Sequence, residues 1–132
     1  MKFTQTDFTG TKEILKFPDH YVALAVTVSD AGVVANADGK KIVEKGTVVG
    51  GETGATLSDD TIPVTKKNTQ GATTGTAGAA VDAEGVLLND VDVTYGPASG
   101  AMIIHGFINT NKLPEAPVAD AVAAIKMIQF ID

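Results

Sequence analysis

Apolar residues of this chain recur in short runs broken by glycine, proline and aspartate, a pattern typical of β-strands joined by turns. The clearest example is the pair of apolar runs at residues 86–94 and 101–108. The second half of the first run alternates valine with aspartate or threonine, which predicts one buried and one exposed face. Residues 95–100, between the runs, are rich in glycine and proline, which favour turns. The pattern predicts an antiparallel β-hairpin.

Other apolar runs predict further strands. Residues 21–28 form a β-branched run that ends at the turn-forming residues 29–32. Pro63 lies in a short apolar piece and favours an edge strand or a position outside the hydrogen-bonded ladder, because proline has no N–H to donate. The additional strand segments are expected at residues 33–35, 41–44, 47–49, 61–64 and 127–131.

One segment has the periodicity of a helix instead. Val118, Ala121, Val122 and Ile125 are spaced to share one helical face, and Pro117 suits the first turn. A single helix is therefore predicted over residues 118–126.

The pattern as a whole predicts a mainly β domain over residues 21–132, preceded by an N-terminal arm. Residues 1–20 show no sustained periodicity and place polar residues between isolated phenylalanines, which predicts a flexible arm. Residues 68–80 are small and uncharged, which predicts a surface loop.

Composition narrows the possible functions. Hydrophobic residues make up 44% of the 132 residues but aromatic residues only 5%, so the core must consist mostly of aliphatic side chains. The net charge is -6 and all ten basic residues are lysines, which argues against binding to a phosphate backbone. The absence of cysteine excludes disulfides and thiolate chemistry. No apolar stretch predicts a signal peptide or a membrane span, so synthesis in the cytoplasm is expected.

Two motifs of binding sites are nearly present. Residues 46–53 have the spacing of a phosphate-binding loop, but Glu52 occupies the position of the lysine and would repel phosphate. Residues 90–94 begin like a calcium loop, but Gly96 comes one place late and Ala101 replaces the bidentate glutamate. Neither motif predicts a phosphate or metal site, and no cofactor is expected.

Catalytic residue types are scarce as well. His20 and His105 are the only imidazoles, and His105, in an apolar strand, is interpreted as a structural histidine. The three serines lie in turn contexts, and Ser99 lacks the spacing of a nucleophile elbow. We therefore predict no catalytic residues and no enzymatic activity, although scattered carboxylates leave a small hydrolase as an alternative.

The order of segments also resembles a known family. The run YVALAVTVSDAGVVANADGKKIVEKGTVVGG at residues 21–51, and the run GVLLNDVDVT followed by a Gly-Pro turn and HGFINTNKLPEAP, resemble the head-decoration and head-fibre proteins of tailed bacteriophages. The resemblance implies a small barrel-like "tulip" domain that forms homotrimers on the outer capsid surface, binds the major capsid protein and stabilises the shell. It implies no nucleic-acid or membrane partner.

The resemblance also implies that the N-terminal arm faces the capsid. Candidate capsid-binding residues in the arm are aromatic residues and threonines: Phe3, Thr4, Thr6, Phe8, Thr11 and Phe17. The base domain of a head fibre and a module that binds the host surface are alternative functions. The expected location is the outside of the virion, after synthesis in the host cytoplasm.

Overall fold

The fold is mainly β, as the sequence pattern predicts, in a computed structural model that describes residues 13–52, 55–68 and 82–132. Within these residues no helix is long and apolar enough to span a membrane. In chain order the elements are β1 (Tyr21–Val28), β2 (Ile42–Val43), β3 (Val48–Gly51), β4 (Val64–Lys66), β5 (Gly85–Leu87), β6 (Val91–Asp92), β7 (Ala98–Asn109), the 3-10 helix η1 (Thr110–Lys112), α1 (Ala119–Ala124) and β8 (Ile128–Ile131).

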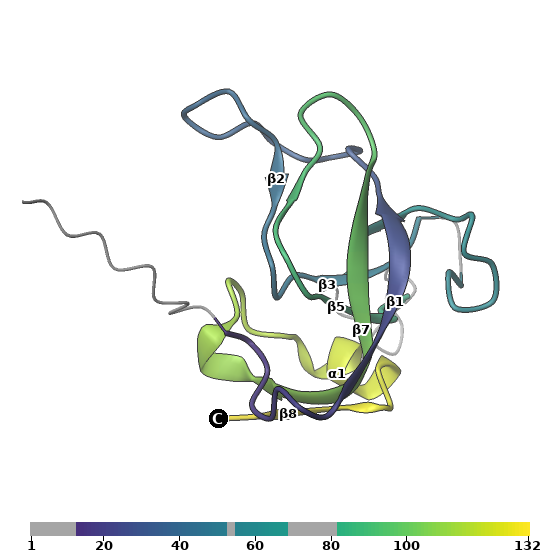
Figure 1. Ribbon diagram of the computed structural model, residues 1–132, viewed down its shortest axis with the longest axis vertical. Helices are drawn as coiled ribbons and strands as arrows, with labels where there is room; N and C mark the ends of the chain where they lie inside the picture. Colours follow the sequence, from purple (N-terminus) through teal and green to yellow (C-terminus); the bar gives the residue numbers. More distant parts are fainter. Residues whose placement is uncertain (1–12, 53–54, 69–81) are drawn as a thin grey trace, which may run out of the picture.

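Five of the described strands close into a small barrel, because the order β1-β4-β3-β5-β7 returns to β1. The β1–β7 pairing is antiparallel and runs from Tyr21 opposite Gly106 to Val28 opposite Ala98, so these strands lie side by side along the barrel (Figure 1). The closing contact between β1 and β4 is short: Val28 is the register partner of Val64, and the two strands are parallel. The ring is closed at this pair of residues, while residues 21–27 of β1 pair with β7 on one side.

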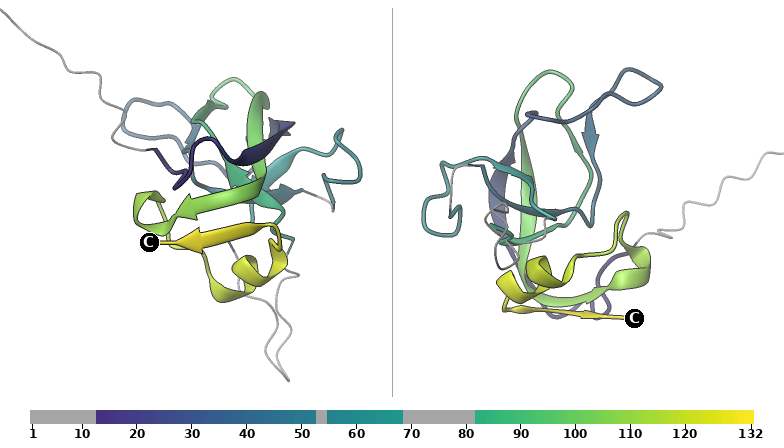
Figure 2. Two further views of the ribbon diagram at one scale, coloured as in Figure 1. Left: turned by 60° about the horizontal axis from the view of Figure 1, so that its bottom comes forward. Right: turned by 180° about the vertical axis from the view of Figure 1, so that it is seen from behind.

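Strand β7 is shared between the barrel and a second layer at its far end. Its last four residues pair in parallel with β8, from Gly106 opposite Ile128 to Asn109 opposite Ile131 (Figure 2, left). Gly106 has a φ of +151°, a value that residues with a side chain rarely adopt, at the point where β7 passes from β1 to β8. The glycine therefore lets one strand serve both layers.

Two clusters of aliphatic side chains form the core, which agrees with the low aromatic content. One cluster fills the barrel, and Leu87 and Met102 at its centre are fully buried. The other lies between the barrel, α1 and β8, and includes Ile103, Ile108 and Ile125. The helix thus closes one end of the barrel through the apolar face that the sequence predicts, although Val122 on that face remains partly exposed.

The segment that precedes β1 belongs to this second cluster. Ile14 and Leu15 are only 1% and 6% exposed. Leu15 forms an antiparallel bridge with Ile108, and Ile14 O accepts a hydrogen bond of 2.8 Å from Asn109 N. The sequence pattern assigns residues 13–20 to the arm, whereas in the structure this stretch packs against the domain and pairs with the end of β7.

Most predicted elements are confirmed with shifts of a few residues. The bounds of β1 match, and β8 and α1 lie inside the predicted segments. Residues 33–35 do not form a strand. The predicted hairpin is present as the antiparallel pair β5–β7, but β6 pairs with β2 rather than continuing it. Pro63 lies just before β4, which is an inner strand, so it is outside the strand, although its carbonyl oxygen accepts a hydrogen bond of 2.8 Å from Glu52 N.

Candidate functional site

An exposed apolar surface surrounds the start of β1, close to the point where the N-terminal segment joins the domain. Phe17, Tyr21, Val22 and Met127 are 50%, 42%, 50% and 62% exposed, although large apolar side chains usually avoid water. Tyr21 is the register partner of Gly106, which donates a hydrogen bond of 3.2 Å to Met127 O. Val22 is the register partner of His105 and points to the other side of β1 from Tyr21. The Phe17 ring packs against Phe107. We refer to these four residues as the N-terminal face. Large apolar side chains exposed near one end of a domain are candidates for contact with a partner.

Local packing holds Phe17 in place although half of its surface is exposed. The backbone turns at residues 17–20, where His20 N donates a hydrogen bond of 3.1 Å to Phe17 O. The Phe17 ring meets the Phe107 ring edge to face, with centroids 5.2 Å apart at 83°. The His20 ring lies 5.8 Å from the same Phe107 ring. Contact with the Phe107 ring therefore positions the side chains of Phe17 and His20 before any partner binds.

The two histidines of the chain meet beside this face. His20 Nε2 lies 3.1 Å from His105 Nε2, although the residues are 85 positions apart. One ring must donate and the other accept. His105 Nδ1 is buried with no hydrogen-bond partner. A buried N–H without a partner is costly, so we assign the proton of His105 to Nε2, from which it donates to His20.

Of the predicted capsid-binding residues, Phe17 is the one that the structure describes. It lies on the N-terminal face and is half exposed, so it is free to contact a partner. Phe3, Thr4, Thr6, Phe8 and Thr11 lie outside the described residues. The sequence did not single out Tyr21, Val22 or Met127, because their apolar runs predict buried strands and periodicity cannot show which end of a strand is uncovered.

A separate pocket of about 410 Å³ opens between the barrel wall and the chain before α1. Its walls are largely aliphatic and include Val28, Val33, Ile42 and Val43. Its size is within the usual range for small-molecule sites.

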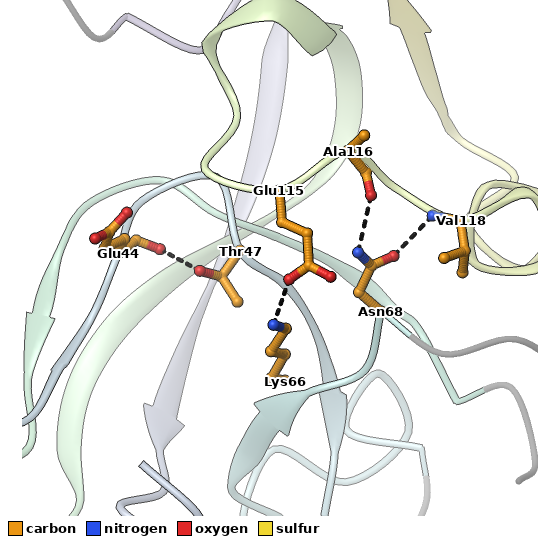
Figure 3. A network of polar contacts seen from close by, with 7 residues as sticks. All are labelled: Glu44, Thr47, Lys66, Asn68, Glu115, Ala116 and Val118. Carbon is orange, nitrogen blue, oxygen red and sulfur yellow. Dashed lines mark hydrogen bonds and ion pairs between the residues drawn. The ribbon is translucent and has the colours of Figure 1, made fainter. Parts of the chain in front are cut away.

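Polar groups at the rim of the pocket are already paired with one another (Figure 3). Lys66 forms an ion pair with Glu115, and this contact lowers the pKa of the Glu115 carboxyl. Asn68 donates a hydrogen bond of 3.0 Å to Ala116 O and accepts one of 2.8 Å from Val118 N. The network fastens the segment before α1 to the end of β4. The role of this network is structural, because its groups form their ion pair and hydrogen bonds with one another and without a ligand.

The acidic residues of the incomplete phosphate-loop and calcium-loop motifs are exposed or form hydrogen bonds within the fold. Glu52 follows β3 and is exposed. Asp90 Oδ1 accepts a hydrogen bond of 2.7 Å from Lys45 N, and Asp92 accepts hydrogen bonds from Thr94, which lower the pKa of the Asp92 carboxyl. Across residues 13–52, 55–68 and 82–132, no three acidic or histidine side chains converge as a metal site would require.

The hydroxyl of Ser29 has a structural contact too. Ser29 is 6% exposed, and its Oγ accepts a hydrogen bond of 3.1 Å from Ala31 N in the turn after β1. This contact fits the turn context in which the sequence places the serine.

Comparison of the chain with protein-family models, with curated proteins and with solved structures found no significant match. The N-terminal face is therefore the feature from which a function is best inferred.

Proposed function

We propose that this protein is a structural component of a tailed-bacteriophage virion, which binds the outer surface of the head as a homotrimer and stabilises the shell. The proposal combines the resemblance of residues 21–51 and 85–132 to head-decoration proteins with the exposed N-terminal face. The partner is the major capsid protein, and the protein acts by binding rather than by catalysis.

The N-terminal face carries the proposal. Phe17, Tyr21 and Val22 expose 42–50% of their surface; Phe17 belongs to the predicted N-terminal arm, and Tyr21 and Val22 directly follow it. A capsid surface that covers them would bury apolar area next to the arm, so face and arm can contact one partner together. Burial of aromatic side chains at the centre of an interface commonly supplies most of the binding free energy.

Stabilisation of the shell follows from linkage. A protein that binds across the joint between two capsid subunits must be released before the subunits separate, so binding raises the free energy of separation. A closed trimer presents three identical faces, which suits a local three-fold position on a capsid. No chemical step is required of the bound protein.

The histidine side chains and the Ser29 hydroxyl form contacts that favour a binding role over catalysis. The two imidazoles of the chain contact each other, and the Ser29 hydroxyl accepts a backbone hydrogen bond. Neither arrangement pairs a nucleophile with a base, as covalent catalysis would need.

Binding of purified variants to heads that lack the protein tests the proposal. Phe17→Ala and Tyr21→Ala remove exposed aromatic area, and each is expected to weaken binding in a sedimentation assay by about 30-fold, the effect of a typical central contact. Val34→Ala is the matched control, because Val34 is 86% exposed in the loop beyond the opposite end of β1. Circular dichroism checks that each variant is folded.

Three results would reject the proposal or its assignment to this face. The first is failure of the intact protein to sediment with heads, and the second is binding of the two aromatic variants as tight as that of the Val34 variant. The third is a monomeric mass in solution and on the head, which would contradict the proposed homotrimer.

A further inference from the structure

We propose that His20 and His105 form a two-histidine site for a divalent transition-metal cation that prefers imidazole nitrogen, namely Cu²⁺, Ni²⁺ or Zn²⁺. The site lies where the segment before β1 meets β7. It lies beside the N-terminal face and uses side chains other than the four of that face.

The distance between the two ring nitrogens supports this site. His20 Nε2 and His105 Nε2 are 3.1 Å apart. A cation bound to both at about 2.05 Å would see them at an angle of about 98°. That angle lies between the roughly 90° of square-planar or octahedral sites and the roughly 109° of tetrahedral sites. Both nitrogens can therefore bind one cation without moving apart.

The surrounding structure holds the two rings in this arrangement. His105 lies within β7, opposite Val22 of β1, so its backbone is fixed by the barrel. The His20 ring packs against Phe107, and the His20 and His105 centroids are 5.1 Å apart at an interplanar angle of 64°. Rings that are oriented before binding lose little freedom when a cation arrives.

The number and kind of ligands select the cation. No third acidic or histidine side chain converges with the pair within the described ranges, and His20 is exposed, so water completes the coordination. Two neutral imidazoles suit Cu²⁺, Ni²⁺ and Zn²⁺, whereas Mg²⁺ and Ca²⁺ prefer oxygen ligands. Affinity is expected to be highest for Cu²⁺, according to the general order for nitrogen sites.

Binding of the cation also requires the other tautomer of His105. Both Nε2 atoms must offer lone pairs, so the proton that His105 donates to His20 moves to the buried Nδ1, which has no partner. This unpaired N–H lowers the affinity for every cation by the same factor, so the order of affinities still follows the preference for imidazole nitrogen. The bound cation would replace one hydrogen bond with two stronger bonds and fasten residues 13–20 to β7.

Titration of the full-length protein, without a histidine tag, tests the site directly. The chain holds two histidines and no cysteine, so coordination by two imidazoles of one chain can only come from this pair. Calorimetry at neutral pH with CuCl₂, NiCl₂ and ZnCl₂ is expected to show one cation per chain, and MgCl₂ and CaCl₂ no binding. The electron paramagnetic resonance spectrum of the Cu²⁺ complex is expected to show coupling to two imidazoles. The melting temperature should rise with cation concentration by linkage.

Single substitutions separate this site from general binding to acidic residues. His20→Gln and His105→Gln are each expected to lower the affinity by at least about tenfold, since loss of even an outer-shell partner costs about 10–100-fold. Asp90→Asn is the control, because it removes a carboxylate from the loop that resembles a calcium site, and it should bind as the parent does. His20→Gln keeps the fold testable, because His20 is exposed.

Two outcomes would overturn the site. One is the absence of saturable binding of all three cations to the unaltered protein. The other is binding that survives both histidine substitutions or that Asp90→Asn abolishes.

Discussion

Replacement of Ile14 by alanine should destabilise the whole domain, although Ile14 lies in a stretch whose sequence reads as an arm. Ile14 is 1% exposed and packs in the cluster formed with Ile108 and Ile125. Its carbonyl oxygen accepts a hydrogen bond from Asn109 N at the end of β7. If this packing is correct, residues 13–20 are part of the folding unit.

The size of the effect follows from the buried volume that is lost. The substitution removes three carbon atoms from a fully buried site, worth about 2.4 kcal/mol at about 0.8 kcal/mol each. The cavity left behind adds to this, so a total of about 3–4 kcal/mol is expected. For a domain of this size each kcal/mol lowers the melting temperature by about 3–5 °C, which gives a decrease of about 9–20 °C.

Urea denaturation followed by circular dichroism measures this difference. Val34→Ala is the control, because Val34 is 86% exposed and its truncation should change the stability by less than about 0.5 kcal/mol. The reasoning is refuted if Ile14→Ala is no less stable than Val34→Ala.

Three other substitutions test the contacts that shape the domain. Gly106→Ala should lower the free energy of unfolding by about 1–3 kcal/mol in the same assay, because φ is +151° and a Cβ would lie 3.2 Å from His20 O. An unchanged stability would contradict the strained turn of β7. Glu84→Ala should cost about 2 kcal/mol and Glu84→Gln less, because the carboxylate accepts hydrogen bonds of 2.6, 2.9 and 3.1 Å from the N–H groups of Gly51, Thr56 and Leu57. Glu115→Gln should cost at most about 0.5 kcal/mol at neutral pH, because the ion pair with Lys66 is exposed. Lys66 lowers the pKa of Glu115 below its ordinary 4.5, so the difference in stability between Glu115→Gln and the unaltered protein should be complete above pH 4.5 and vanish as the pH falls further. An equal loss of stability at every pH would contradict this role of the ion pair.

The sequence predicts those elements whose local pattern agrees with their tertiary surroundings. β1 is a continuous run of mostly apolar residues, half of them β-branched, and both the strand and its bounds were predictable. The helix carried a clear apolar face and a preceding proline, and α1 lies within the predicted range. The strand expected at residues 33–35 failed because a short apolar run has no stable strand structure without a neighbour to pair with.

The contacts missing from the prediction depend on residues far apart in the chain. Ile14 and Leu15 are two apolar residues between charged neighbours, too few to show periodicity, and their burial depends on β7 and α1. The meeting of His20 and His105 requires the register of β1 against β7, which no local spacing reveals. The exposure of Tyr21 and Met127 likewise depends on how the barrel ends, so the N-terminal face could not be located from the sequence.

Thermal release of DNA from phage heads tests the central claim most directly. Full heads with and without this protein are heated, and a DNA-binding dye reports rupture. Packed DNA pushes the shell outward, so a protein bound across subunit joints should raise the rupture temperature, and adding the purified protein to heads that lack it should restore the higher value. Equal rupture temperatures with and without the protein, or recovery of the protein only from the head interior, would contradict the account.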